Sequence, residues 1–193
     1  GWTNLLEVFL ILLIPFALPR TYGVMVGDKR QGYTVLGAMA ILAIGSLVSL
    51  TALQMSFANS NLAAMEGKET RFGVLGSTLF ATATTLTSTG AVNSMHSSYE
   101  PLSGGILIFN MLLGEISPGG VGSGLYGMLV VAIIGVFISG LMVGRSPEYM
   151  GKRIGPTEVK LISMYALVVP VVVLLGTGLA IALPSTRDSL ANF

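Results

Sequence analysis

Four long apolar stretches limit the folds that this chain can adopt. They cover residues 5–26, 33–57, 102–143 and 159–183. A helix needs about 20 predominantly apolar residues to cross a bilayer, and each stretch is at least that long. Charged residues make up only 10% of the chain, against about 25% in typical soluble domains. We therefore predict an all-α integral membrane protein with four transmembrane regions.

The rest of the composition excludes several classes of protein. The net charge is +1 and no basic run could neutralise a row of phosphates, so we expect no nucleic-acid partner. The chain has no cysteine and a single histidine, which excludes disulfides and thiolate metal sites and leaves little for a histidine-based one. Its start lacks the pattern of a signal peptide. Because it begins at Gly1 beside a span, we expect an excerpt of a longer protein.

A fifth apolar segment is too short to cross the membrane. It reads RFGVLGSTLFATATTL, residues 71–86, and contains several threonines. Its length of about 16 residues falls short of a full span. We therefore predict a re-entrant pore helix and a filter loop over residues 71–96, which enter and leave the membrane on the same side.

Lysine and arginine in the short loops predict the orientation. Basic residues gather in GDKRQG, residues 27–32, and around GRSPEYMGKRIGP, residues 144–156, whereas the loop over 58–76 balances two basic residues against two acidic ones. The two basic loops are therefore predicted to be cytoplasmic. Both chain ends and the filter loop then face the outside.

The third apolar region is too long for one straight span. About 42 helical residues would reach about 63 Å, twice the ~30 Å hydrocarbon core. Its middle reads GEISPGGVGSG, residues 114–124, and contains five glycines and Pro118, residues that disfavour a continuous helix. Non-helical backbone at membrane depth persists only where it is buried in protein or lines a cavity. We therefore predict that this glycine-rich loop breaks the third span.

The polar stretch TTLTSTGAVNSMH, residues 84–96, is the candidate ion site. If the re-entrant helix ends near Leu86, the negative end of its dipole favours a cation. Gly90 permits a positive φ that would let consecutive carbonyls point the same way, and such oxygens replace the hydration shell of an ion in selectivity filters. The alternative is that these small residues only allow close helix packing.

A span, a re-entrant helix, a polar loop and a second span make up the M1-P-M2 unit of potassium channels. Residues 33–143 would form one such unit, with the broken second helix over 102–143. Four units are needed to enclose a pore, so this one cannot conduct alone.

Three motifs resemble a known family. MEGKETRFGVLGSTLFATATTLTSTGAVNSMHSS, GEISPGGVGSGLYGMLVVAIIGVFISGLMVGRSPEYMGKRIGPTEVK and GDKRQG are similar to the potassium-binding, channel-like subunit of bacterial Kdp potassium-transporting ATPases. The resemblance implies four non-identical repeats in one polypeptide. Residues 1–32 would then hold the last helix of the second repeat and a cytoplasmic loop. Residues 33–143 would be the third repeat, and residues 144–193 a cytoplasmic loop and the first helix of the fourth.

The resemblance also implies which residues handle the ion. The third repeat's filter, which would bind K⁺, matches Ser88, Thr89 and Gly90, and Thr87 adjoins it as a further ion-binding candidate. Many members have a cysteine where this chain has Thr89, a departure that leaves carbonyl coordination intact. A gating loop below the filter matches Gly119, Gly120, Gly122, Ser123 and Gly124.

The implied function is ATP-driven potassium import. The subunit would select K⁺ at the outer face of the bacterial inner membrane and deliver it to a P-type ATPase catalytic subunit. Small accessory subunits of the Kdp complex, membrane lipid and the remaining repeats of its own polypeptide would be its other neighbours. This chain has no Walker loop and no aspartyl-phosphate segment, so it would be a non-catalytic subunit.

Glu115 has two interpretations. Intramembrane acids usually face a cavity, because an acid at the centre of a span costs about 2.5 kcal/mol or more, and the resemblance places Glu115 beside the inner ion path. Alternatively, it accepts hydrogen bonds from backbone N–H groups that the helix break sets free.

Other functions stay open from the residues. A passive channel or an ion-coupled potassium transporter of the same superfamily is the nearest alternative, and a purely structural assembly subunit is another. A remote one is an intramembrane serine protease with Ser123 as nucleophile and His96 as base, although His96 is predicted near the outer surface and Ser123 about a half-span deeper.

Overall fold

The computed structural model describes residues 1–60, 65–68, 70–120 and 123–186, without the side chains of residues 59 and 60. Within these residues, four helices are long and apolar enough to cross a membrane. The predicted all-α membrane class is confirmed. The chain forms two compact units, Gly1–Leu129 and Val130–Phe193. The predicted repeat boundaries stay a prediction.

The first unit begins with two long helices that pack against each other, α1 (Trp2–Met25) and α2 (Lys29–Ser60). The turn between them contains Gly27, whose φ is +80°. Glycine also allows close approach of the two backbones, because a Cβ on Gly32 would come within 2.6 Å of the carbonyl oxygen of Pro19. The residues of GDKRQG that we expected in a loop mostly begin α2.

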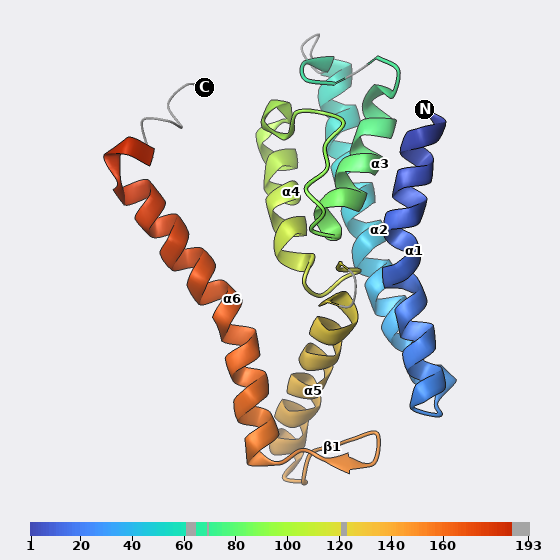
Figure 1. The fold of residues 1–193 in the computed structure, drawn as a ribbon, viewed down its shortest axis with the longest axis vertical. Coiled ribbons are helices and arrows are strands. Elements are labelled where there is room, and N and C mark those ends of the chain that lie inside the picture. Colours follow the sequence, from blue (N-terminus) through green and yellow to red (C-terminus); the bar gives the residue numbers. More distant parts are fainter. Residues whose placement is uncertain (61–64, 69, 121–122, 187–193) are drawn as a thin grey trace. The chain divides into compact units, whose positions relative to one another are not determined.

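A short helix, α3 (Gly73–Leu86), packs against both α1 and α2. Its 14 residues reach about 21 Å at 1.5 Å each, too short for a span. Figure 1 shows that the chain after α3 runs back along the helix toward the end where α3 begins. Two contacts fix this return: the amide of Met95 donates to the carbonyl of Gly67 over 2.8 Å, and Lys68 forms a β-bridge with Ser94.

The third apolar region contains two helices, as predicted. A 3₁₀ turn (His96–Ser98) leads into α4 (Pro101–Leu113), and α5 (Ser123–Val143) follows after a break. Helix α4 packs against α2 and α3. The described part of the break contains a cis peptide bond between Ser117 and Pro118. Insertion of α3 and its loop into a bilayer stays a prediction.

The second unit contains the remainder of α5, a two-stranded hairpin and helix α6 (Pro156–Ala182). The hairpin pairs β1 (Glu148–Tyr149) with β2 (Lys152–Arg153) in the antiparallel sense, and we did not expect it from the sequence. Its turn residues Met150 and Gly151 have φ of +51° and +75°, the left-handed pair that a tight two-residue hairpin requires. This ribbon lies in the basic segment that we predict to be cytoplasmic.

Candidate ion-binding loop and its surroundings

Threonine hydroxyls line the last turns of α3 and point back into the helix. The hydroxyl of Thr85 donates to the carbonyl of Ala81 over 2.6 Å, and that of Thr87 donates to Ala83 over 2.8 Å. Thr84 donates to Phe80 over 3.0 Å. These bonds satisfy buried hydroxyl protons locally, so the threonines fit a tightly packed helix end. The helix ends at Leu86, where the sequence places its end.

The free carbonyls at the end of α3 receive donors from the loops that follow. The amide of Thr89 donates to Thr84 over 3.0 Å, and the amide of Ser88 donates to Thr85 over 3.2 Å. The carbonyl of Leu86 accepts from the amide of Gly119, 3.2 Å away in the glycine-rich break. The helix end therefore still presents a negative dipole, but these carbonyls are engaged in holding the two loops in place.

The backbone of the loop itself alternates in handedness. Ser88 has φ of +53° and Gly90 has φ of +72°, whereas Thr89 between them is not in the positive-φ region. A positive φ is uncommon for a residue other than glycine, and holding one costs about 1–3 kcal/mol. Ser88, Thr89 and Gly90 are all exposed, and only Thr87 is buried. The strained loop thus presents its backbone on an open face of the first unit.

The glycine-rich break lies directly against this loop. A Cβ on Gly114 would collide with the hydroxyl of Ser88, and one on Gly120 would lie 3.4 Å from the carbonyl oxygen of Thr87. The amide of Gly120 donates to the hydroxyl of Ser123 over 3.0 Å. The structure therefore brings the predicted gating loop and the predicted filter together. Gly122 lies outside the described residues.

Glycine is required for the packing of the break on the start of α5. A Cβ on Gly119 would overlap Gly124, one on Gly124 would overlap the carbonyl of Pro118, and one on Gly127 would overlap the carbonyl of Glu115. The carboxylate side chain of Glu115 is exposed. Among the described residues, no donor or cation is seen against it, and both interpretations of Glu115 stay open.

A small polar cluster anchors the far end of the loop. The Nζ of Lys68 lies 4.6 Å from the centroid of the Tyr99 ring, and the Tyr99 hydroxyl lies 2.8 Å from the hydroxyl of Ser94. The rings of His96 and Tyr99 are nearly perpendicular, with 6.0 Å between their centroids. Burial lowers the pKa of both Lys68 and His96 and raises that of Tyr99, whose hydrogen bond to Ser94 acts in the opposite direction.

The protease alternative finds no catalytic geometry in the described residues. Ser123 accepts its hydrogen bond from Gly120 within the break, whereas His96 lies in the cluster around Tyr99. No described hydrogen bond joins the two side chains, which a nucleophile and its general base require.

A buried polar chain behind α3 was not predicted from the sequence. Ser46 in α2 donates to the side-chain oxygen of Asn110 in α4, at 2.5 Å, and the amide nitrogen of Asn110 donates to the hydroxyl of Thr85 in α3, at 3.3 Å. Asn110 is fully buried. The signal that could have revealed it is an asparagine inside the apolar run ILIFNMLL.

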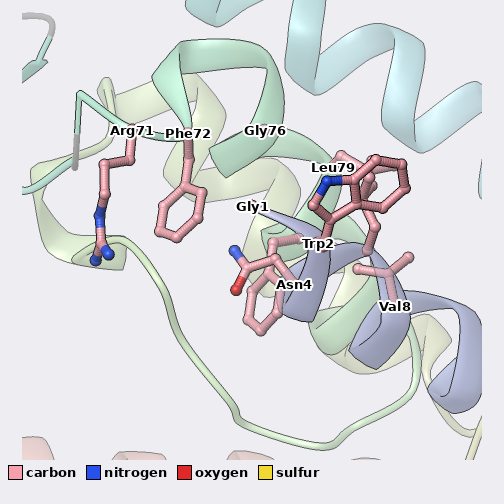
Figure 2. Close-up of a pocket in the computed structure, with 10 residues that line it drawn as sticks. Gly1, Trp2, Asn4, Val8, Arg71, Phe72, Gly76 and Leu79 are labelled. Carbon is pink, nitrogen blue, oxygen red and sulfur yellow. The ribbon is translucent and has the colours of Figure 1, made fainter.

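A pocket lies on the other side of α3 from these polar groups. It has a volume of about 320 Å³ and lies between the first turns of α1 and α3. Figure 2 shows Trp2 beside Leu79 on one side of the view, and Phe72 with Arg71 on the other. Its lining is mostly apolar and includes none of the predicted filter or gating residues, so it is separate from the predicted ion site.

Comparison with known proteins gives one family. The sequence profile described as "Potassium-transporting ATPase A subunit" matches residues 1–193. The chain is similar to the "Potassium-transporting ATPase potassium-binding subunit" of Clavibacter sepedonicus, with 58% identity over 194 residues, 98% of this chain and 35% of the relative. Proteins with the same description from Frankia alni and Streptomyces griseus subsp. griseus are 57% and 60% identical, over 100% and 98% of this chain and 33% and 35% of their own length. The chain thus spans about a third of the curated relatives it matches.

Proposed function

Since the chain belongs to the family of potassium-transporting ATPase A subunits, we propose that it contains one ion-selecting repeat of the potassium-binding subunit. Its filter would take K⁺ from the outside, and energy would come from a P-type ATPase catalytic subunit, because this chain holds no nucleotide-binding motif. The site is the loop Thr87, Ser88, Thr89 and Gly90, with Glu115 on the inner path.

The alternating backbone of that loop is the observation that carries the proposal. In an extended chain, successive carbonyls point to opposite sides. Positive φ at Ser88 and again at Gly90 would turn them to the same side, and carbonyls arranged in this way replace the water around a dehydrated cation. Close packing of helices explains small residues, but it does not require the sign of φ to alternate along an exposed loop. Strained backbone concentrates at functional sites.

The glycine-rich break would act as a barrier below the filter. It touches Thr87 and Ser88 from beneath and is held to the end of α3 by the bond from Gly119 to Leu86. An ion that has passed the filter would then leave sideways, near the exposed carboxylate of Glu115, toward the partner subunit. In this arrangement the complex lies in the bacterial inner membrane, the filter faces outward, and the basic loops are cytoplasmic.

Substitution of Gly90 tests the proposal. In the purified full complex, Gly90→Ala should raise the K⁺ concentration for half-maximal ATP hydrolysis at least about tenfold and weaken discrimination against Na⁺, because a Cβ disfavours φ of +72°. Gly104→Ala is the matched control, since that glycine lies in α4 with open space around it. Wild-type K⁺ affinity and selectivity in a well-assembled Gly90→Ala complex would exclude the filter assignment.

A passive channel predicts a different outcome. K⁺ flux into liposomes that proceeds in the absence of ATP and of the partner, and that Gly90→Ala abolishes, would keep the filter but reject the ATP-driven role.

A further inference from the structure

We propose that Asn110 is a positioning residue that holds the end of α3, and through it the filter loop, in the conformation that selects the ion. The inference rests on the proposed function, because it assigns a specificity-determining role to a residue that lies outside the loop. Asn110 itself does not touch the ion site. It acts through Thr85 and Ser88.

The hydrogen bonds around Asn110 have a defined direction. The hydroxyl of Thr85 donates to the carbonyl of Ala81, so toward Asn110 it can only accept. The amide nitrogen of Asn110 must therefore face Thr85, and its oxygen then faces Ser46 and accepts the serine proton. This orientation uses one donor and one acceptor of the amide. A carboxylate of the same size cannot donate to Thr85, so aspartate cannot replace asparagine here.

Asn110 joins three helices that are distant in sequence. Ser46 is in α2, Asn110 in α4 and Thr85 in α3. Helix α4 is otherwise strongly apolar, and apolar contacts alone tolerate a slip of one helix past another. A buried amide is unfavourable unless it is paired, so a slip of α4 along α3 would leave Asn110 without its partners. One buried polar residue can fix a register in this way.

The predicted filter begins just after Thr85, the residue to which Asn110 is bonded. The backbone carbonyl of Thr85 accepts the amide of Ser88, the residue with φ of +53° that begins the alternating segment. One turn after Asn110, Gly114 leaves the space that the side chain of Ser88 occupies. The carbonyl of Asn110 accepts the amide of Gly114 over 2.8 Å. The first residue of the alternating segment therefore packs against the last turn of α4.

Three substitutions in the purified full complex test this role. Asn110→Leu keeps the number and branching of the side-chain heavy atoms and removes both hydrogen bonds. Asn110→Asp removes the donor to Thr85, and Thr85→Val removes the acceptor. Each should raise the half-saturating K⁺ concentration about fivefold or more and narrow the preference for K⁺ over Rb⁺. The maximal rate of ATP hydrolysis at saturating K⁺ should stay within about twofold of wild type, because no group on the later path has changed.

A double substitution separates this bond from a general loss of stability. If Asn110 acts through Thr85, the variant with both Asn110→Leu and Thr85→Val should lose no more affinity than the worse single variant. Thr51→Val is the matched control. It removes a 3.1 Å hydroxyl contact to Thr78, which joins α2 to α3 in the first half of α3, and it should leave K⁺ affinity unchanged.

The outcomes distinguish the inference from the proposed function. Unchanged affinity and selectivity in assembled Asn110→Leu, together with a clear effect of Gly90→Ala, would overturn the role of Asn110 and leave the filter in place. No effect of Gly90→Ala would instead overturn the filter assignment itself. A loss of affinity in Thr51→Val as large as that in Asn110→Leu would show that any weakened α3 packing suffices, and would also overturn the inference. If Asn110→Leu does not assemble, Thr85→Val decides by the same criterion.

Discussion

Single backbone positions determine how the two loops below α3 meet. Gly90 was expected to have a positive φ because the loop needs a residue without a Cβ. Ser88 was not expected to, and it has φ of +53° while its amide is bonded to Thr85 and its side chain lies beside Gly114. The energetic cost of this torsion is offset by contacts to another helix, which the sequence around Ser88 does not display.

Gly119 lies in the break at a position that cannot accept a side chain without strain. Its φ is +77°, and a Cβ would overlap the backbone of Gly124. Gly119→Ala should therefore cost about 1–2 kcal/mol from the left-handed torsion alone, plus the displacement of Gly124. We expect a lower unfolding temperature of the complex and ATP-independent K⁺ leakage in liposomes, because the bond from Gly119 to Leu86 would be lost.

Gly37→Ala provides the comparison for Gly119→Ala. Gly37 lies in α2, and a Cβ added at this position would meet nothing within 4 Å. Alanine favours a helix over glycine by about 1 kcal/mol, so this substitution should not destabilise the complex. If Gly119→Ala has the same unfolding temperature as Gly37→Ala and shows no ATP-independent K⁺ leakage, the break tolerates a side chain at this position and the proposed barrier is contradicted.

At the scale of elements, the loop between α3 and α4 is fastened at both ends. Near α3, Thr89 and Ser88 are bonded to the helix end, and near α4, Ser94 and Met95 are bonded to the residues that precede α3. The predicted filter thus lies between two fixed points. A loop held in this way can keep unfavourable torsions that a free chain would relax.

The cluster of Lys68, Ser94, His96 and Tyr99, which holds the end of the loop near α4, should weaken in acid. Burial lowers the pKa of His96 below its ordinary 6.5, so the neutral ring is favoured in the folded state. The stability that this contributes is present above pH 6.5 and is lost as the pH falls through the lower folded-state pKa. Protonation would also place a second cation near Tyr99, whose ring already lies under Lys68.

The measurement is the unfolding temperature of the complex at about pH 7.5 and about pH 5.5. His96→Gln should show a smaller decrease between the two than wild type, because glutamine does not titrate. Ser97→Ala, a change at the exposed neighbour, should keep the full decrease. Equal decreases in wild type and His96→Gln would show that other groups cause the acid sensitivity.

At the scale of the whole molecule, long apolar helices leave most of their surface for lipid or for other parts of the protein. Helix α6 has no buried residue in its most apolar window. The chain spans about a third of the length of its relatives, so a protein of that length has further segments that could pack against such surfaces. In our proposal, further repeats would also cover the exposed face of the filter loop, because a pore requires several repeats around it.

Labelling of single cysteines tests the proposed orientation. The sequence holds no cysteine of its own, and any in the rest of the full subunit would be replaced first. Ser97→Cys should react with a membrane-impermeant thiol reagent added to intact cells, because the filter side faces outward in our proposal. Lys152→Cys, in the hairpin of the second unit, should react only after permeabilisation. Both positions are exposed, and the reverse pattern would invert the topology.

The sequence alone determined the features that depend on local chemistry. Hydrophobic length gives the spanning helices and marks α3 as too short to be one, glycine and proline give the break between α4 and α5, and Gly90 permits the turn of the filter loop. Each depends on residues that are neighbours along the chain. The ion-binding role of the loop stays a prediction.

Only the tertiary structure decided which polar groups meet. The partners of Asn110 are 64 and 25 residues away, and the bond from Gly119 to Leu86 joins the break to the end of α3, although a whole helix separates them in the sequence. A buried hydrogen bond depends on distance and direction between helices, and apolar periodicity does not specify the register in which those helices pack. The packing of α2, α3 and α4 fixes that register, and it thereby brings the break beneath the filter loop.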